Sequence, residues 1–328
     1  MKNFVTHTLY ATLAIATISL TPLLAEEGIN TREPKWKQVS QAYGFILAQG
    51  YSLNRITAEY PDLEPSVRAA NFAFMSTGLG EGANSLEAAL KEELGDKWPA
   101  TKTELEKQFL ALAEKQVLTR EVATRYIDEV KQRAKGVMPE SIRDTLLATN
   151  PAYVKSPGAE MSAGWRQNFS TLKHPKSEGA DITIGMPLSW RKRESTRDGI
   201  VQVFRSGAGN GPILCNIICK KILEDADGDA TPEDMKDFFT DAILKEMVPD
   251  DATFIEGRPM TIAGAVGGIN IFDMTQEMLD VKMKMRSTTF IIIHKKQLIQ
   301  LNFLIMGQFL KDMDFDEAQK AYFPTYRA

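Results

Sequence analysis

Apolar side chains recur with the period of an α-helix from about residue 35 to residue 150. Val39, Tyr43, Ile46 and Leu47 stand at positions i, i+4, i+7 and i+8, which places them on one face of a helix. Further stretches with this spacing follow, separated by short connections, and short connections favour antiparallel packing of consecutive helices. The pattern predicts a domain built as a small helical bundle over residues 26–150.

Capping residues indicate where these helices begin and end. Ser, Thr and Pro are frequent at helix N-termini, and Gly is frequent just after the last turn. Helix starts are expected at Ser85, at Thr101 with Glu104 as a capping box, at Thr119 and at Pro139, and helix ends at Gly95 and Gly136.

Regular periodicity stops between residues 151 and 179. Pro, Gly and Ser are frequent in this stretch, and no apolar period extends across it. We therefore predict a linker at residues 151–179, and with it the boundary between two domains.

Past residue 180 the period changes to two. Val281, Met283 and Met285 alternate with Lys282 and Lys284, which is typical of a half-buried strand in an antiparallel sheet. The order of strands and helices predicts an α+β fold, in which the helical bundle is followed by an antiparallel-sheet domain flanked by helices at residues 180–328. Strands are expected at 182–184, 200–205, 213–220, 253–256, 260–263, 268–275, 281–293 and 298–305, with one helix from Thr231 through Met247 and a last one that holds Phe315, Ala318 and Tyr322.

The second half of the chain resembles the PsbP/Mog1/DcrB-like superfamily over about residues 180–326. The resemblance is carried by Ile182-Thr-Ile-Gly-Met-Pro187-Leu-Ser-Trp190, the strand Val201-Gln-Val-Phe204, the helix in mid-domain, and the long hairpin from Met283 to Ile305 before a closing helix. It implies a central antiparallel sheet flanked by helices. It also implies a non-enzymatic role in binding or assembly, without a catalytic motif to carry over. The helical domain resembles no family that we recognise.

The first 25 residues have the pattern of a secretory signal peptide. Lys2 is their only charged residue, an apolar run follows from Leu9 to Leu20, and Ala25 precedes the acidic Glu26. An uncleaved membrane anchor is the alternative, but a span needs about 20 apolar residues, and this run is shorter. We expect cleavage after about Ala25, a periplasmic or secreted bacterial protein, and no membrane span afterwards.

Composition excludes some classes of protein. The net charge is −4, which does not favour nucleic-acid binding, because that requires a basic footprint. The two cysteines, Cys215 and Cys219, fall in one expected strand, where four residues separate their Cα atoms by roughly 13 Å. A disulfide requires less than about 7 Å. Both should instead be buried thiols on the face that carries Ile213 and Ile217.

Motifs for metals and cofactors are incomplete. Asp225, Asp227 and Asp229 have the spacing of the first ligands of an EF-hand loop. Ala230 stands where that loop needs Gly, however, and Lys236 stands where it needs Glu, so an acidic turn before a helix is the favoured interpretation. Neither of the glycine-rich segments, 207–211 and 264–268, has the residues of a phosphate or dinucleotide loop. We expect no metal and no cofactor.

Histidine is scarce, which limits the catalytic alternatives. His174 and His294 are the only ones after the signal segment, and neither lies in a zinc or nucleophile motif. A hydrolase with its site between the two domains remains the alternative function, and it requires one of these rings beside a Ser and a carboxylate. The methionine-rich segment at Met274, Met278, Met283 and Met285 fits either an adaptable binding surface or, as we favour, core packing.

One group of cations is a candidate partner-binding site. Lys282, Lys284 and Arg286 share a strand face, and Arg191 follows Trp190. If they converge, they form a basic patch suited to an unknown acidic protein or envelope ligand. The alternative is a solvated face, or a face covered by a helix whose acids pair with it. The sequence thus favours a non-enzymatic periplasmic binding or assembly factor of the bacterial envelope.

Overall fold

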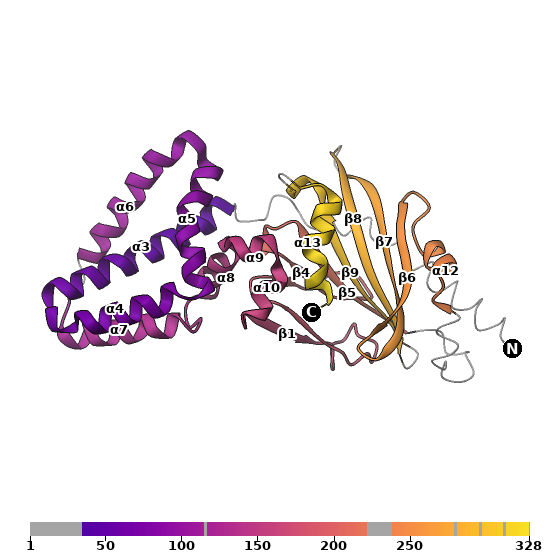
Figure 1. The fold of residues 1–328 in the computed structure, drawn as a ribbon, viewed down its shortest axis with the longest axis horizontal. Helices are drawn as coiled ribbons and strands as arrows, with labels where there is room; N and C mark the ends of the chain where they lie inside the picture. Colours follow the sequence, from indigo (N-terminus) through magenta and orange to yellow (C-terminus); the bar gives the residue numbers. More distant parts are fainter. Residues whose placement is uncertain are drawn as a thin grey trace. The chain divides into compact units, whose positions relative to one another are not determined.

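The computed structural model describes residues 35–114, 117–221, 238–278, 281–294, 297–310 and 313–327. These residues form two compact units. The helical unit comprises Glu33–Arg166 together with Pro187–Trp190, and the sheet unit comprises Gln167–Met186 and Arg191–Arg327. The predicted fold class, helices followed by an antiparallel sheet with flanking helices, is confirmed (Figure 1).

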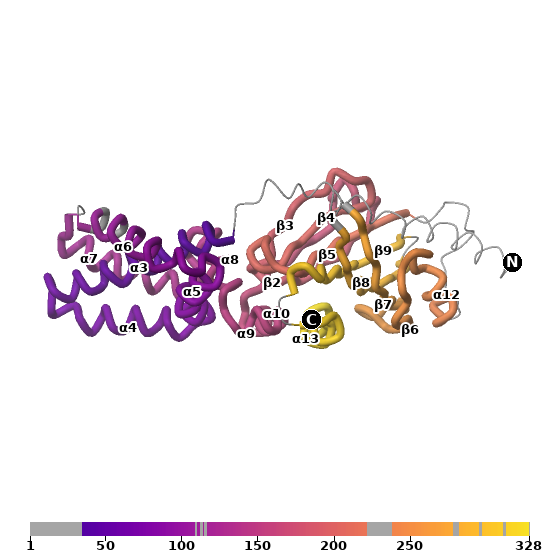
Figure 2. The backbone as a smooth tube through the Cα atoms, turned by 90° about the horizontal axis from the view of Figure 1, so that it is seen from above, coloured from indigo at the N-terminus to yellow at the C-terminus, as the bar shows by residue number. Residues whose placement is uncertain are grey.

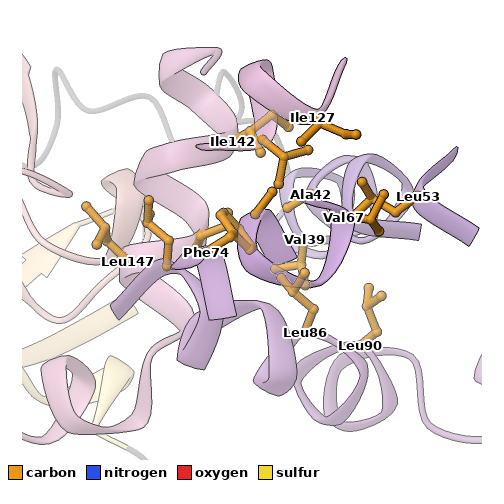
Figure 3. Close-up of a cluster of buried hydrophobic side chains, with 14 of the residues drawn as sticks. Val39, Ala42, Leu53, Val67, Phe74, Leu86, Leu90, Ile127, Ile142 and Leu147 are labelled. Carbon is orange, nitrogen blue, oxygen red and sulfur yellow. The ribbon is translucent and has the colours of Figure 1, made fainter. Parts of the chain in front are cut away.

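Helices of the first unit pack around one apolar core. Among its fully buried side chains are Phe74, Leu79, Leu86 and Leu146, and Figure 3 shows part of this cluster. A Cβ atom at Gly82 would overlap the carbonyl group of Leu146, so glycine allows α5 and α8 to approach closely. The helices are α3 (Lys35–Glu59), α4 (Glu64–Met75), α5 (Gly78–Leu94), α6 (Trp98–Glu114), α7 (Arg120–Arg133), α8 (Glu140–Thr149), α9 (Pro151–Lys155) and α10 (Pro157–Ser162).

Two predicted helix starts are wrong. Helix α5 begins seven residues before Ser85, at Gly78, and its N-cap is Thr77, whose hydroxyl accepts from the Gly80 N–H. The hydroxyls of Ser85 and Thr101 donate to backbone carbonyls four residues earlier. A Ser or Thr inside a helix makes this bond as readily as it caps one, so residue type alone cannot separate the two cases.

The other predicted ends agree with the structure more closely. Thr119 is the N-cap of α7 and accepts from the Val122 N–H, while Gly95 follows the last residue of α5 with a φ of 53°. Pro139 precedes α8 as its N-cap rather than serving as its first residue. Gly136 has a φ of 85° just beyond the end of α7.

The segment expected as a linker, residues 151–179, contains regular elements. Pro151 and Pro157 are the first residues of α9 and α10, a position where proline is favoured because its missing N–H has no helical partner. Strand β1 (Arg166–Ser170) then pairs with β2 (Thr183–Pro187) in a two-stranded sheet. The prolines that interrupt the helical period therefore start new helices.

The sheet unit is built on seven antiparallel strands in the order β3-β4-β5-β9-β8-β7-β6. The segments expected separately at 253–256 and 260–263 are one strand, β6, at the edge of the sheet. The strands are β3 (Arg191–Arg193), β4 (Ile200–Arg205), β5 (Ile213–Lys221), β6 (Thr253–Ile262), β7 (Ala265–Met278), β8 (Val281–His294) and β9 (Gln297–Met306).

Helices cover both faces of this sheet. On one face, α13 (Phe315–Arg327) packs through aromatic rings: Tyr326 stacks on Phe303 at 4.1 Å between ring centroids. On the other, α12 (Asp241–Glu246) lies so close that a Cβ at Gly268 would meet Leu244. Figure 2 shows the two helices beside the sheet. We call these two sides the α13 face and the α12 face.

The mid-domain helix differs from its prediction. Thr240 is the N-cap of α12, and its hydroxyl accepts from the Ile243 N–H. A helix that starts at Asp241 cannot run unbroken through Phe238, as the spacing of apolar residues had suggested. The expected start at Thr231 lies outside the described residues.

Candidate partner-binding surface

Arg286, one of the predicted partner-binding residues, forms ion pairs with two acidic residues. Its guanidinium donates to Asp273 on β7 through two bonds, Nε to Oδ1 at 2.7 Å and Nη2 to Oδ2 at 2.9 Å. It also donates to Asp316, at the start of α13. Arg286 is only 7% exposed, and the bond to Asp273 raises the pKa of its guanidinium above the ordinary value. This cation is therefore buried within the fold. For Arg286, the structure agrees with the alternative interpretation, in which a helix covers this face of the sheet and its acids pair with the basic residues.

Lys282 and Lys284 remain at the surface. Both point to the same side of β8 as Arg286, because side chains two residues apart share a face. Both are exposed, and their cross-strand neighbours on β7 are Glu277 and Thr275. No ion pair to either lysine occurs within the described part of the chain. The two lysines keep the accessibility that a contact with an acidic partner requires.

Arg191 does not join them. The strand register relates Arg191 on β3 to Ser287 on β8 through four successive cross-strand pairs. These pairs are Arg191 with Arg205, Arg205 with Leu214, Leu214 with Leu304, and Leu304 with Ser287. Directly opposed residues of antiparallel strands project from the same face, so Arg191 lies on the face of Ser287. Arg286 is the neighbour of Ser287 in the same strand, and it therefore lies on the opposite face of the sheet. The hypothesis of one patch built from Arg191, Lys282, Lys284 and Arg286 is therefore wrong in its geometry, and the sequence spacing alone could not show this because it does not determine strand order.

The two cysteines lie where the strand register predicted. Both are free, and both are fully buried on the α13 face with Ile213 and Ile217. Burial raises the pKa of the Cys219 thiol to about 12, and it raises that of Cys215 further. A thiol with so high a pKa holds its proton at neutral pH and does not react as a nucleophile.

Among the described residues, neither histidine is paired for hydrolysis. The ring of His174 lies edge-on to Phe169, and its Nδ1 accepts from the backbone N–H of Lys176. The nearby Ser177 hydroxyl donates to the His174 backbone carbonyl and not to the ring. His294 is exposed at the end of β8, opposite Gln297. Within the described ranges, neither ring bonds to both a serine and a carboxylate.

One buried carboxylate was missed by the sequence analysis. Glu160 on α10 is 2% exposed. Its Oε1 accepts from the Ser189 N–H and its Oε2 from the Ser189 hydroxyl, both at 2.7 Å. Burial raises the pKa of this carboxyl to about 7, against the opposing effect of the bonds to Ser189. No local pattern marks the pair, since the two residues are 29 positions apart.

Two other predicted features lie in parts of the chain that the structure does not describe. The calcium candidate, Asp225 to Asp229, and the signal segment, residues 1–25, lie outside the described residues. Among residues that are described, no cluster of three or more His, Cys, Asp or Glu side chains could hold a metal ion. A helix both long and apolar enough to cross a membrane is also absent from this part of the chain.

Comparison with known proteins gives partial similarities of fold. No family model matches the chain, and no curated protein matches it. Cyanobacterial PsbP (CyanoP) from Synechocystis sp. PCC 6803 is similar to 44% of this chain over 81% of its own, with 16% identity and a TM-score of 0.28. LpqN, involved in cell envelope biogenesis of Mycobacterium tuberculosis, is similar to 48% over 83%, also with 16% identity and a TM-score of 0.28.

Proposed function

We propose that this chain is a non-enzymatic binding or assembly factor of the bacterial envelope, exported to the periplasm, and that Lys282 and Lys284 contact an acidic partner. The observation that carries the proposal is the contrast along β8. Arg286 is paired with two acids, whereas the two lysines before it on the same face are exposed.

The position of the lysines on a strand supports this role. Lys282 and Lys284 project from a β-strand that is paired to β7 from Val281 to Ile292, so their backbone is fixed before a partner arrives. A fixed backbone lowers the entropy lost on binding compared with a loop. The attraction itself acts between solvent-exposed charges, which salt screens beyond about 8 Å at physiological ionic strength.

Binding to envelope material tests the proposal. The exported full chain is incubated with a solubilised envelope fraction at low and at moderate salt, and captured proteins are identified. Vesicles of phosphatidylglycerol form a separate arm, which distinguishes anionic lipid head groups from an acidic protein. The variant Lys282→Glu, Lys284→Glu should lose roughly tenfold or more in affinity, because each exposed ion pair contributes up to about 1 kcal/mol and both are reversed.

A matched variant separates this effect from net charge. Lys107→Glu, Lys135→Glu changes the charge equally at two exposed positions of the helical unit and should capture the partner like the wild type. Equal capture by both double variants, or capture that is insensitive to salt, contradicts the proposed role of Lys282 and Lys284.

A further inference from the structure

Methionines are concentrated in one corner of the sheet unit. A buried cluster on the α12 face has ten members, and four of these are Met274, Met283, Met285 and Met306. None is more than 9% exposed. In the helical unit, Met75 and Met138 pack half-buried against the core, and Met161, Met186 and Met247 are buried outside the cluster. Four of the seven buried methionines of the described residues thus share this one cluster.

Strand register brings the four side chains together. Met285 on β8 is directly opposite Met274 on β7 and Met306 on β9, and directly opposed residues have Cβ atoms about 4.5–5.5 Å apart. Met283 is two positions before Met285 on the same face, roughly 7 Å away. Three rotatable bonds let each thioether sulfur move within its side chain, so sulfurs from three adjacent strands can meet above Met285.

The surroundings of this cluster suit a soft monovalent cation. Its other members are apolar, and they include Phe272, Leu304 and Val203. Thioether sulfur is a soft ligand that selects Cu(I), whereas Mg²⁺, Ca²⁺ and Mn²⁺ prefer oxygen. A single positive charge is also less costly to bury among neutral ligands than a double charge.

We propose that Met274, Met283, Met285 and Met306 form a thioether site for Cu(I) or its analogue Ag(I). The site lies on the face of the sheet opposite Lys282 and Lys284 and is independent of the function proposed above. A purely structural methionine cluster predicts no metal binding, so the two interpretations differ in a measurable property.

The experiment titrates the full chain, labelled with ¹³C at its methionine methyl groups, with Ag(I) under anaerobic, thiol-free conditions. We expect one equivalent of Ag(I) to shift the methyl resonances of these four residues. Cu(I) affinity is measured by competition with bicinchoninate. Met285→Leu should weaken it at least tenfold, because Met285 is the central ligand and leucine preserves the volume of the side chain.

Met186→Leu is the matched control, since Met186 is equally buried in the sheet unit but outside the cluster. It should bind Cu(I) like the wild type. Cys215 and Cys219 are thiols on the opposite face, and binding to them would survive Met285→Leu. The proposal is overturned if Ag(I) leaves all four methyl resonances unshifted, or if the Met285 variant, folded by circular dichroism, binds Cu(I) with wild-type affinity.

Discussion

Both polar groups of Ser189 donate to the carboxylate of Glu160, each at 2.7 Å. Ser189 belongs to Pro187–Trp190, which groups with the helical unit although its sequence neighbours on both sides belong to the sheet unit. Burial and, to a smaller extent, the charge of Asp144 raise the pKa of this carboxyl, and burial together with the charge of Glu160 raises the pKa of Tyr153. The buried pair thus holds the short segment Pro187–Trp190 in the helical unit.

The first prediction concerns the pH dependence of stability. The pKa of Glu160 is about 7 in the folded protein against an ordinary value of 4.5, so the folded state binds this proton more tightly than the unfolded state. The resulting stabilisation is complete below about pH 4.5 and is lost as the pH rises to about 7. The difference between these two pKa values corresponds to roughly 3 kcal/mol of stability.

Glu160→Gln should remove this dependence, because its amide is neutral at every pH and can still accept from the Ser189 N–H. We expect the variant to be more stable than the wild type at pH 8 and to lack the decline between pH 4.5 and 7.5. Urea unfolding across that range measures it. Glu121→Gln, at an exposed position of α7, is the control. Parallel curves for wild type and Glu160→Gln would contradict the raised pKa.

A second prediction isolates the hydroxyl of Ser189. Ser189→Ala removes the donor to Glu160 Oε2 and leaves the backbone donor in place. A hydrogen bond to a charged group contributes about 1.5–3 kcal/mol, and one to a neutral group about half of that. The cost of the substitution should therefore be larger at pH 8.5, where Glu160 is ionised, than at pH 5.5. A cost that does not change with pH would mean that the carboxyl is not titrating between these values.

Periodicity predicted the sheet well and the helix ends poorly. The long strands β8 and β9 were located to within a residue or two at each end. In β8, the alternation of Met and Lys over its half-buried first part is a strong signal. Ser85 and Thr101 were misassigned because a residue that can cap a helix can also sit inside one. The run from Pro151 to Ser162 was missed since helices of five and six residues are too short to show a period.

The candidate site shows a different limit of sequence reasoning. That Lys282, Lys284 and Arg286 share a face follows from the strand period alone. The position of Arg191 depends on the order of strands and on register, and the pairing of Arg286 depends on where α13 lies. Both are properties of the tertiary structure, and so is the bond between Glu160 and Ser189.

A third prediction follows from the buried thiols. Cys215 and Cys219 are fully buried, and burial raises the pKa of both, so neither should be alkylated by iodoacetamide at pH 8 while the sheet is folded. Denaturation should expose both at once. Mass spectrometry of pulse-labelled protein reports each cysteine separately. Fast native labelling of either one would contradict the register of β5 against β9.

A fourth prediction concerns export. The charged start, the apolar run to Leu20 and Ala25 predict that the mature protein begins near Glu26 and is recovered from the periplasm or the medium. Edman degradation of the recovered protein determines the first residue. Retention of Met1 on a membrane-bound protein would identify the segment as an anchor, and retention in the cytoplasm would remove the basis for an envelope role.

The last prediction ranks the three members of the Arg286 network. The Arg286 side chain is 8% exposed, that of Asp273 34% and that of Asp316 84%. Asp273→Asn leaves a buried guanidinium without its bidentate partner and should cost about 2 kcal/mol or more, because an uncompensated buried charge is expensive. Asp316→Asn removes a largely solvated acid and should cost under about 1 kcal/mol. Arg286→Met should fall between them, since it leaves Asp273 partly accessible to water and replaces the cation with an apolar chain of similar length.

Urea unfolding of the three variants at pH 7 gives the ranking. If Asp316→Asn is as costly as Asp273→Asn, the bond from α13 contributes more than its exposure implies, and α13 rather than β7 is what holds Arg286 away from a partner.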